Sequence, residues 1–188
     1  MADNVYGVKL VVLTELNQDG STKADGKVIR IDTPQEVSYS PNIKEGGETE
    51  LRGGDKLIAT VKDDDTLTSI TATFKDAKLD IEAMALIGGG TVTGTGDTAK
   101  YAAPKMSETT RTPFKAEIYS AIYGDGSNTA GDIEAYAKVT LNYAKGKIPS
   151  FAQADKAFSV PSYTIVGTEN GAQNLSCYGI ERVAALPA

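Results

Sequence analysis

The chain has 188 residues, with 19 Lys and Arg against 25 Asp and Glu, a formal net charge of -6, one Cys and no His. Without His, the Ser-His-Asp and Cys-His nucleophilic systems and His-ligated zinc or haem are excluded. A single Cys forms neither an internal disulfide nor a Cys-rich metal site. The acidic balance also argues against a tight grip on nucleic-acid phosphates, which requires clustered Lys and Arg. Most enzyme templates are therefore excluded, and the length predicts one domain.

Alternating apolar and polar residues, separated by polar turns, predict four antiparallel hairpins. The first joins residues 6–13 and 27–31 around the turn at 17–20, and the second joins 57–61 and 70–74 with a reversal at 63–65. The third is the longest and joins 114–122 and 133–143 across 124–131. The fourth joins 159–166 and 175–183 around 169–171.

One segment between the second and third hairpins predicts a short amphipathic helix. Asp80 can cap its N-terminus, Glu82 lies in the first turn, where the helix dipole favours an anion, and Gly88 is expected to supply the left-handed C-terminal residue. Leu79 and Met84 occupy the positions of a hydrophobic staple. The apolar stripe expected to pack on a sheet consists of Leu79, Ala83, Leu86 and Ile87.

The fold class predicted from these elements is mainly β: a β-sandwich or partly closed barrel built from hairpins, with one short flanking α-helix. We expect a single domain over residues 1–188, with long loops at 41–54 and 94–112. Structureless connections longer than about 12 to 15 residues are usually functional or disordered. These two segments are therefore the predicted partner contacts.

The motifs that could carry chemistry have more ordinary interpretations. The glycines at 88–96 follow the predicted helix, whereas a phosphate-binding loop precedes one. The run 125–128 with Asp132 has oxygen ligands for calcium but not the EF-hand order, which favours a hairpin tip. A glycosidase-type carboxylate pair stays open as the weakest alternative. We predict no catalytic, cofactor-binding or metal site.

Targeting signals are not evident in the chain. The N-terminal residues lack the basic start and apolar core of a signal peptide, and no apolar run approaches the roughly 20 residues that cross a bilayer. We therefore expect a soluble protein made in a reducing compartment.

Residues 37–91 contain several runs that form a family signature rather than a catalytic motif. The runs are Val37-Ser38-Tyr39-Ser40-Pro41, Glu45-Gly46-Gly47-Glu48, Glu50-Leu51-Arg52-Gly53-Gly54-Asp55, Asp64-Asp65-Thr66-Leu67, Thr71-Ala72-Thr73-Phe74, Leu79-Asp80-Ile81-Glu82-Ala83 and Leu86-Ile87-Gly88-Gly89-Gly90. The pattern resembles the tail tube, or major tail, proteins of long-tailed bacteriophages and related prophages. One departure is Ile81, which stands at the first helical position, where Pro is favoured.

The resemblance implies a structural, non-enzymatic virion protein without a cofactor. Such a subunit self-assembles into hexameric rings that stack into a hollow tail tube, through which DNA passes without sequence-specific binding. The implied partners are further copies of the chain, the tape-measure protein, the tail terminator and the distal tail proteins, with no membrane. The protein would be made in the bacterial host cytoplasm and would end in the virion tail.

By analogy, the resemblance also assigns contact residues in the two long loops. An inter-ring stacking loop would comprise Pro41, Asn42, Ile43, Lys44, Glu45, Glu48, Glu50, Leu51 and Arg52. A second contact loop would comprise Lys100, Tyr101, Lys105 and Arg111.

Two other functions remain open from the sequence. One is the related tube protein of a contractile tail or injection machine, which a sheath protein encoded nearby would distinguish. The other is a β-sandwich adhesin or carbohydrate-binding module, which predicts a monomer with a saturable ligand.

Overall fold

A computed structural model describes residues 3–108, 110–124 and 133–187. It is mainly β, with 56% strand and 8% helix, antiparallel sheets and one α-helix, which confirms the predicted fold class as a β-sandwich with a short helix. The strands are β1 (Asn4–Glu15), β2 (Val28–Ile31), β3 (Pro34–Lys44), β4 (Glu48–Gly53), β5 (Lys56–Lys62), β6 (Thr66–Asp76), β7 (Thr91–Thr93), β8 (Lys100–Ala102), β9 (Phe114–Tyr123), β10 (Ile133–Gly146), β11 (Ser162–Thr168) and β12 (Tyr178–Val183). The helix is α1 (Ile81–Gly88), and two short 3-10 turns are η1 (Gly96–Thr98) and η2 (Gly171–Gln173).

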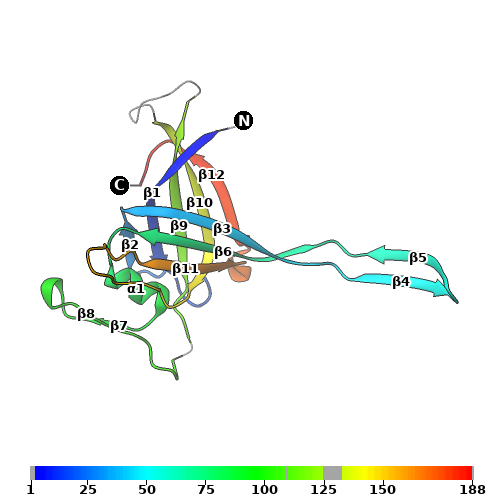
Figure 1. Ribbon diagram of the computed structural model, residues 1–188, viewed down its shortest axis with the longest axis horizontal. Coiled ribbons are helices and arrows are strands. Elements are labelled where there is room, and N and C mark those ends of the chain that lie inside the picture. The colour runs from blue at the N-terminus through cyan, green and yellow to red at the C-terminus, as the bar shows by residue number, and fades with distance from the viewer. Residues whose placement is uncertain (1–2, 109, 125–132, 188) are drawn as a thin grey trace.

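The main sheet has eight strands in the order β2-β1-β9-β10-β11-β6-β3, and β12 is a side branch on β10. The branch arises because β10 is long: its residues 136–141 pair with β12, and its residues 143–146 pair with β11. Beyond the branch, β11, β6 and β3 lie across β1, β9 and β10 as a second layer (Figure 1).

The core lies between these layers. Val11, Ile118 and Leu141 come from the first layer, and Phe74 and Tyr163 from the second, all at most 1% exposed. The Phe74 and Tyr163 rings stack with centroids 5.1 Å apart. Alternation along each strand therefore buries one face of each layer, as the sequence pattern predicts.

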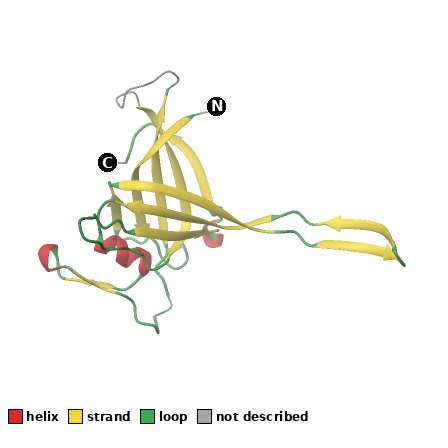
Figure 2. Cartoon of the chain, in the orientation of Figure 1, coloured by secondary structure: helices red, strands yellow, loops and turns green. Residues whose placement is uncertain are grey.

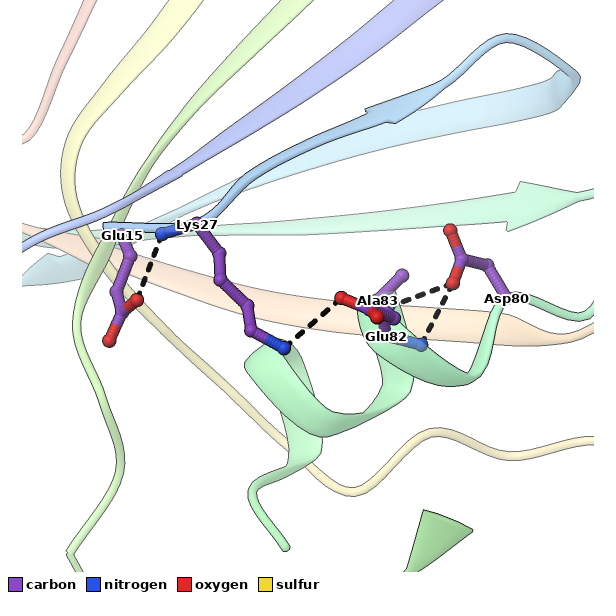
Figure 3. Close-up of polar contacts among 5 residues, drawn as sticks. All are labelled: Glu15, Lys27, Asp80, Glu82 and Ala83. Atoms are coloured by element: carbon purple, nitrogen blue, oxygen red, sulfur yellow. Dashed lines mark hydrogen bonds and ion pairs between the residues drawn. The ribbon is translucent and has the colours of Figure 1, made fainter. Parts of the chain in front are cut away.

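Helix α1 closes one end of the core and begins as predicted. The Asp80 carboxylate accepts hydrogen bonds from the backbone N–H groups of Glu82 and Ala83, at 2.8 and 3.2 Å (Figure 3). The buried helix residues are Ala83, Met84, Leu86, Ile87 and Gly88, whereas Leu79, which was expected on the same stripe, is 46% exposed.

The end of α1 differs from the prediction by one residue. Gly88 belongs to the helix, and the positive backbone angle, φ 76°, falls on Gly89. Gly88 is instead required by packing, because a Cβ there would lie 2.6 Å from Cδ of Pro149.

Two of the four predicted hairpins are confirmed. β1 pairs with β2, and β9 pairs with β10, antiparallel in both cases. The reversal between β9 and β10, including the alternative calcium ligands at 125–128 and Asp132, lies outside the described residues.

The predicted hairpin across residues 63–65 is wrong. β5 pairs with β4, and β6 pairs with β3 and β11. The chain passes from β5 into β6 without reversing, and the reversal lies instead at Gly54, whose φ is +65°. Three consecutive aspartates are typical of a turn, but they are equally favourable in an exposed joint, where their charges stay hydrated.

The predicted hairpin around 169–171 is also wrong in its pairing. Its two strands exist as β11 and β12, but each pairs with β10, and only a single bridge joins Asn170 to Leu175. The strands are neighbours in sequence yet lie end to end along the same edge of β10.

The C-terminal residues form a strap over the outer face of the first layer. Leu186 packs on an outer cluster of Leu10, Val12 and Tyr119. Beyond it, the Pro187 carbonyl oxygen accepts a hydrogen bond from Arg30 of β2 at 3.1 Å. The strap therefore crosses the sheet from β12 to β2 and buries an apolar patch on an otherwise polar face.

Candidate interaction interface

A two-stranded arm projects from the body of the protein (Figure 2). We define the arm as residues 41–68, which comprise the outer ends of β3 and β6 and the whole ribbon of β4 and β5. Every residue of the arm except Gly46 is exposed. The prediction that 41–54 is a structureless loop is therefore wrong: most of it is strand, and it is one half of a long hairpin.

The arm has an inner and an outer ladder separated by a joint. β3 and β6 stay paired out to Lys44 and Thr66, and the ribbon resumes with Glu48 opposite Lys62. Residues 45–47 and 63–65 form the joint, where the Gly46 N–H donates to a carboxylate oxygen of Asp65 at 3.0 Å.

The ribbon has two chemically different faces. Directly opposed residues share a face, so Thr49 with Val61 and Leu51 with Ala59 lie on one side. A bulge then adds Ile58 to this side, because the Ile58 Cδ1 lies 2.7 Å from where a Cβ of Gly53 would stand. We call Thr49, Leu51, Ile58, Ala59 and Val61 the apolar ribbon face; Lys56, opposite Gly53, ends it.

The opposite side of the ribbon is mostly charged. Glu48 faces Lys62, Glu50 faces Thr60, and Arg52 faces Leu57. Glu50 and Arg52 are paired at 2.8 Å, but both are exposed, so the pair contributes little to stability. Leu57 belongs to the predicted strand 57–61, and the bulge places it on this charged side, opposite Arg52.

The root of the arm continues the core face of the second layer outward. Along β3, Val37 packs against the core, and Tyr39, Pro41 and Ile43 follow it at alternate positions. Leu67 of β6 lies opposite Ile43. The surface that is buried in the body thus extends as an apolar stripe with no described residue covering its outer end: Ile43 is 58% exposed.

Of the residues predicted for the stacking loop, Asn42 has an internal role. Its side-chain amide nitrogen donates to the hydroxyl oxygens of Ser69 and Thr71 at 2.9 and 3.0 Å. Its backbone carbonyl oxygen accepts a hydrogen bond from the Thr68 hydroxyl. These bonds hold the inner ladder together. The other predicted residues are exposed along the arm: Pro41, Ile43, Lys44, Glu45, Glu48, Glu50, Leu51 and Arg52.

The second predicted contact loop, 94–112, contains η1 and β8, and half of its predicted contact residues serve the fold. The Tyr101 hydroxyl donates to the Gly89 carbonyl oxygen at 2.9 Å, and its partial burial raises the pKa of Tyr101. Arg111 lies beside the same glycine and donates to the carbonyl oxygen of Glu108. Tyr101 therefore ties the segment to the residue that follows α1, and Arg111 bonds within the segment, whereas Lys100 and Lys105 are exposed.

Two concave regions elsewhere contain charged side chains that bond with other groups of the chain. A groove of about 600 Å³ over β9, β10 and β12 contains Lys138, which bonds with Glu181 and lies 3.5 Å from Glu117. The Glu181 hydrogen bond raises the pKa of Lys138. A groove of about 500 Å³ beside α1 contains Asp76, bonded to the Thr33 hydroxyl, and the capping Asp80.

Metal-binding clusters and membrane-spanning helices are both absent from the described part of the chain. Within residues 3–108, 110–124 and 133–187, no group of three or more acidic or thiol side chains could hold a metal ion. No helix in this part of the chain could span a bilayer. Six of the large hydrophobic side chains that are exposed lie on the arm: Ile43, Leu51, Leu57, Ile58, Val61 and Leu67.

Neither the family models nor the curated proteins contain a match to this chain.

Sequence reasoning missed four arm residues, Leu57, Ile58, Val61 and Leu67, which belong to the candidate interface. The first three fall in the predicted strand 57–61, which was expected to build a hairpin of the core, and Leu67 lies outside both strands of that hairpin. The available signal was the Gly53-Gly54-Asp55 turn between two segments of similar length, which indicates a hairpin closed at Gly54 rather than at 63–65.

Proposed function

We propose that the chain is a structural subunit that self-assembles, as a phage tail tube protein does, into stacked hexameric rings around a channel for DNA. The observation that carries this proposal is the arm, an exposed ribbon with an apolar face and no partner within the described chain. The sequence resemblance over residues 37–91 supplies the class of assembly.

An isolated two-stranded ribbon is at best marginally stable in water. This arm also carries large hydrophobic side chains that are 42% to 65% exposed. They are Ile43, Leu51, Leu57, Ile58, Val61 and Leu67. Large hydrophobic side chains that gather at the surface in this way mark an interaction site.

The gain from covering the arm can be compared with the cost of association. Burying an aliphatic side chain fully is worth about 1.5 to 3 kcal/mol, so six half-exposed ones contribute roughly 5 to 10 kcal/mol. Association itself costs about 4 to 15 kcal/mol. One arm therefore supports only a weak pairwise contact, whereas several arms engaged together in a ring support a stable one.

Sheet edges supply the lateral contacts in this proposal. Among the described strands, β2 pairs only with β1, and β12 pairs only with β10. Each keeps one edge on which a neighbouring copy can add a strand. Pairing of these edges within the assembly also prevents uncontrolled edge-to-edge aggregation.

The net charge of -6 suits a conduit. An acidic wall repels phosphates and lets DNA pass, since neutralised phosphates would retain it. The partners that follow from the resemblance are the tape-measure protein during assembly, and the tail terminator and distal tail proteins at the tube ends.

The test is negative-stain electron microscopy of concentrated protein, with a variant in which residues 47–62 are deleted. This deletion joins Gly46 to Asp63 across the joint and leaves both β3 and β6 intact. We expect rings and tubes from the intact chain, and at most single rings from the deletion variant. A strictly monomeric intact chain would contradict self-assembly and favour a β-sandwich binding module, and normal tubes from the deletion variant would contradict the role of the arm.

A further inference from the structure

An apolar socket opens at the root of the arm, where the two layers of the body diverge. Its volume is about 190 Å³, and it is lined by Tyr39, Pro41, Ile70, Val139, Tyr178 and Ile180. The residues come from β3, β6, β10 and β12, that is, from both layers. No charged side chain lines it.

The socket is open to solvent on the side of β12. Ile180, on the edge strand, is 68% exposed, and Tyr39 is 38% exposed. An aliphatic side chain of a protein partner would fill a cavity of this size and would cover both. A polar ligand would find few hydrogen-bonding groups, since the lining is aliphatic and aromatic.

The apolar ribbon face has matching chemistry, but it does not reach the socket of its own chain. The ribbon continues the direction of β3 and β6 away from the body (Figure 1), and β4 and β5 pair only with one another. The same chain therefore carries an apolar projection and an apolar socket at opposite ends of one arm. The two surfaces are continuous, because Tyr39 and Pro41 of the socket begin the stripe that leads to Ile43.

We propose that the socket of one copy receives the apolar ribbon face of a second copy, with Ile58 at the bulge as the inserted side chain. The charged ribbon face, with Glu50 and Arg52, then stays in water. This inference rests on the proposed self-assembly and adds the surface on the second copy that the arm occupies.

The geometry of such a contact determines the assembly. A projection that fills a socket elsewhere on an identical chain makes a heterologous contact, which leaves a free arm on one copy and a free socket on the other. Such a contact can repeat from copy to copy, either closing into a ring or continuing as an open stack.

Disulfide cross-linking between differently labelled copies tests this contact. Copies carrying Ile58→Cys are mixed with copies carrying Ile180→Cys, both in a Cys177→Ala background, and oxidised. The matched control replaces Ile180→Cys with Ser38→Cys. Ser38 is an exposed residue of β3 that adjoins Tyr39 but lies on the opposite face of the strand.

We expect the Ile58 and Ile180 variants to form a mixed disulfide at least about tenfold more than the Ile58 and Ser38 variants. Light scattering of the same mixtures before oxidation reports whether the copies associate. If the copies associate but Ile180→Cys cross-links no more than Ser38→Cys, the socket is not the docking site of the arm, and the proposed function still stands. No association and no cross-link would overturn both.

Discussion

The backbone N–H of Asp63 donates a hydrogen bond to the carbonyl oxygen of Gly47 at 2.9 Å, across the joint between the two ladders of the arm. The joint replaces regular pairing over residues 45–47 and 63–65. The direction of the ribbon relative to the body therefore depends on a few polar contacts rather than on packing.

Gly46 is the residue at which this joint is most sensitive. A Cβ on Gly46 would collide with the carbonyl oxygen of Asp63, whereas a Cβ on Gly47 would lie 3.5 Å from its nearest neighbour, a carboxylate oxygen of Asp63. We expect Gly46→Ala to redirect the ribbon and to raise the concentration needed for assembly about tenfold, equivalent to about 1.4 kcal/mol. Gly47→Ala is the matched control.

Sedimentation velocity over a concentration series measures this effect, and thermal unfolding should show the same body stability in both variants. Equal assembly of the two variants would mean that the direction of the ribbon does not matter for the contact.

The cap of α1 allows a test of local helix stability. Asp80→Ala removes the acceptor for the backbone N–H groups of Glu82 and Ala83, which should cost about 1 kcal/mol. For a chain of this length, we expect the melting temperature to fall by about 2 to 4 °C.

Two further variants separate the cap from general charge effects. Asp80→Ser keeps a capping oxygen and should restore most of the loss. Glu82→Gln removes the exposed pair with Lys27, 3.1 Å long (Figure 3), and should change stability by less than about 0.5 kcal/mol. A larger effect for Glu82→Gln than for Asp80→Ala would contradict the assignment of the cap.

The elements that the sequence predicted correctly are those whose two faces meet different surroundings. β9 and β10 alternate because one face lies on the core, and α1 has an apolar stripe because it closes that core. Such a difference produces a regular spacing of apolar and polar residues, and this spacing predicts the strand or helix.

The arm could not be recognised in the same way, since both of its faces meet water. β4 and β5 are exposed at every position, so burial imposes no alternation, and the bulge at Ile58 breaks what regularity there is. The sequence pattern of a strand also does not specify which strand it pairs with. β11 and β12 were predicted as strands but were paired with each other, whereas each pairs with β10. Strand pairing depends on the length of β10, which only the three-dimensional structure shows.

Tyr163 makes the stability of the body sensitive to alkaline pH. Burial, together with the nearby carboxylate of Asp76, raises the pKa of Tyr163 to about 12. An unfolded tyrosine titrates near pH 10, so the folded state holds its proton more tightly between these values. The corresponding stability is complete below about pH 10 and is lost as the pH rises through about 12, by roughly 2 to 3 kcal/mol.

Urea unfolding at pH 8 and at pH 11.5, for the intact chain and for Tyr163→Phe, measures this loss. The ring stacked on Phe74 is kept in the variant, so its stability at pH 8 should be close to that of the intact chain. We expect the variant to lose less stability at pH 11.5. An identical loss in both proteins would mean that other groups account for the alkaline transition.

If one face of the arm holds copies of the chain together, two neighbouring residues of β5 should respond differently to the same added charge. Val61 lies on the apolar ribbon face and Thr60 on the charged one, and both are exposed, so a carboxylate at either position should leave the body folded. We expect Val61→Asp to weaken self-association by at least about tenfold, because assembly would bury its charge, and Thr60→Asp to change it little. Sedimentation velocity of the three proteins at matched concentrations measures their self-association. Equal association of Val61→Asp and the intact chain would contradict a role for the apolar ribbon face in holding copies together.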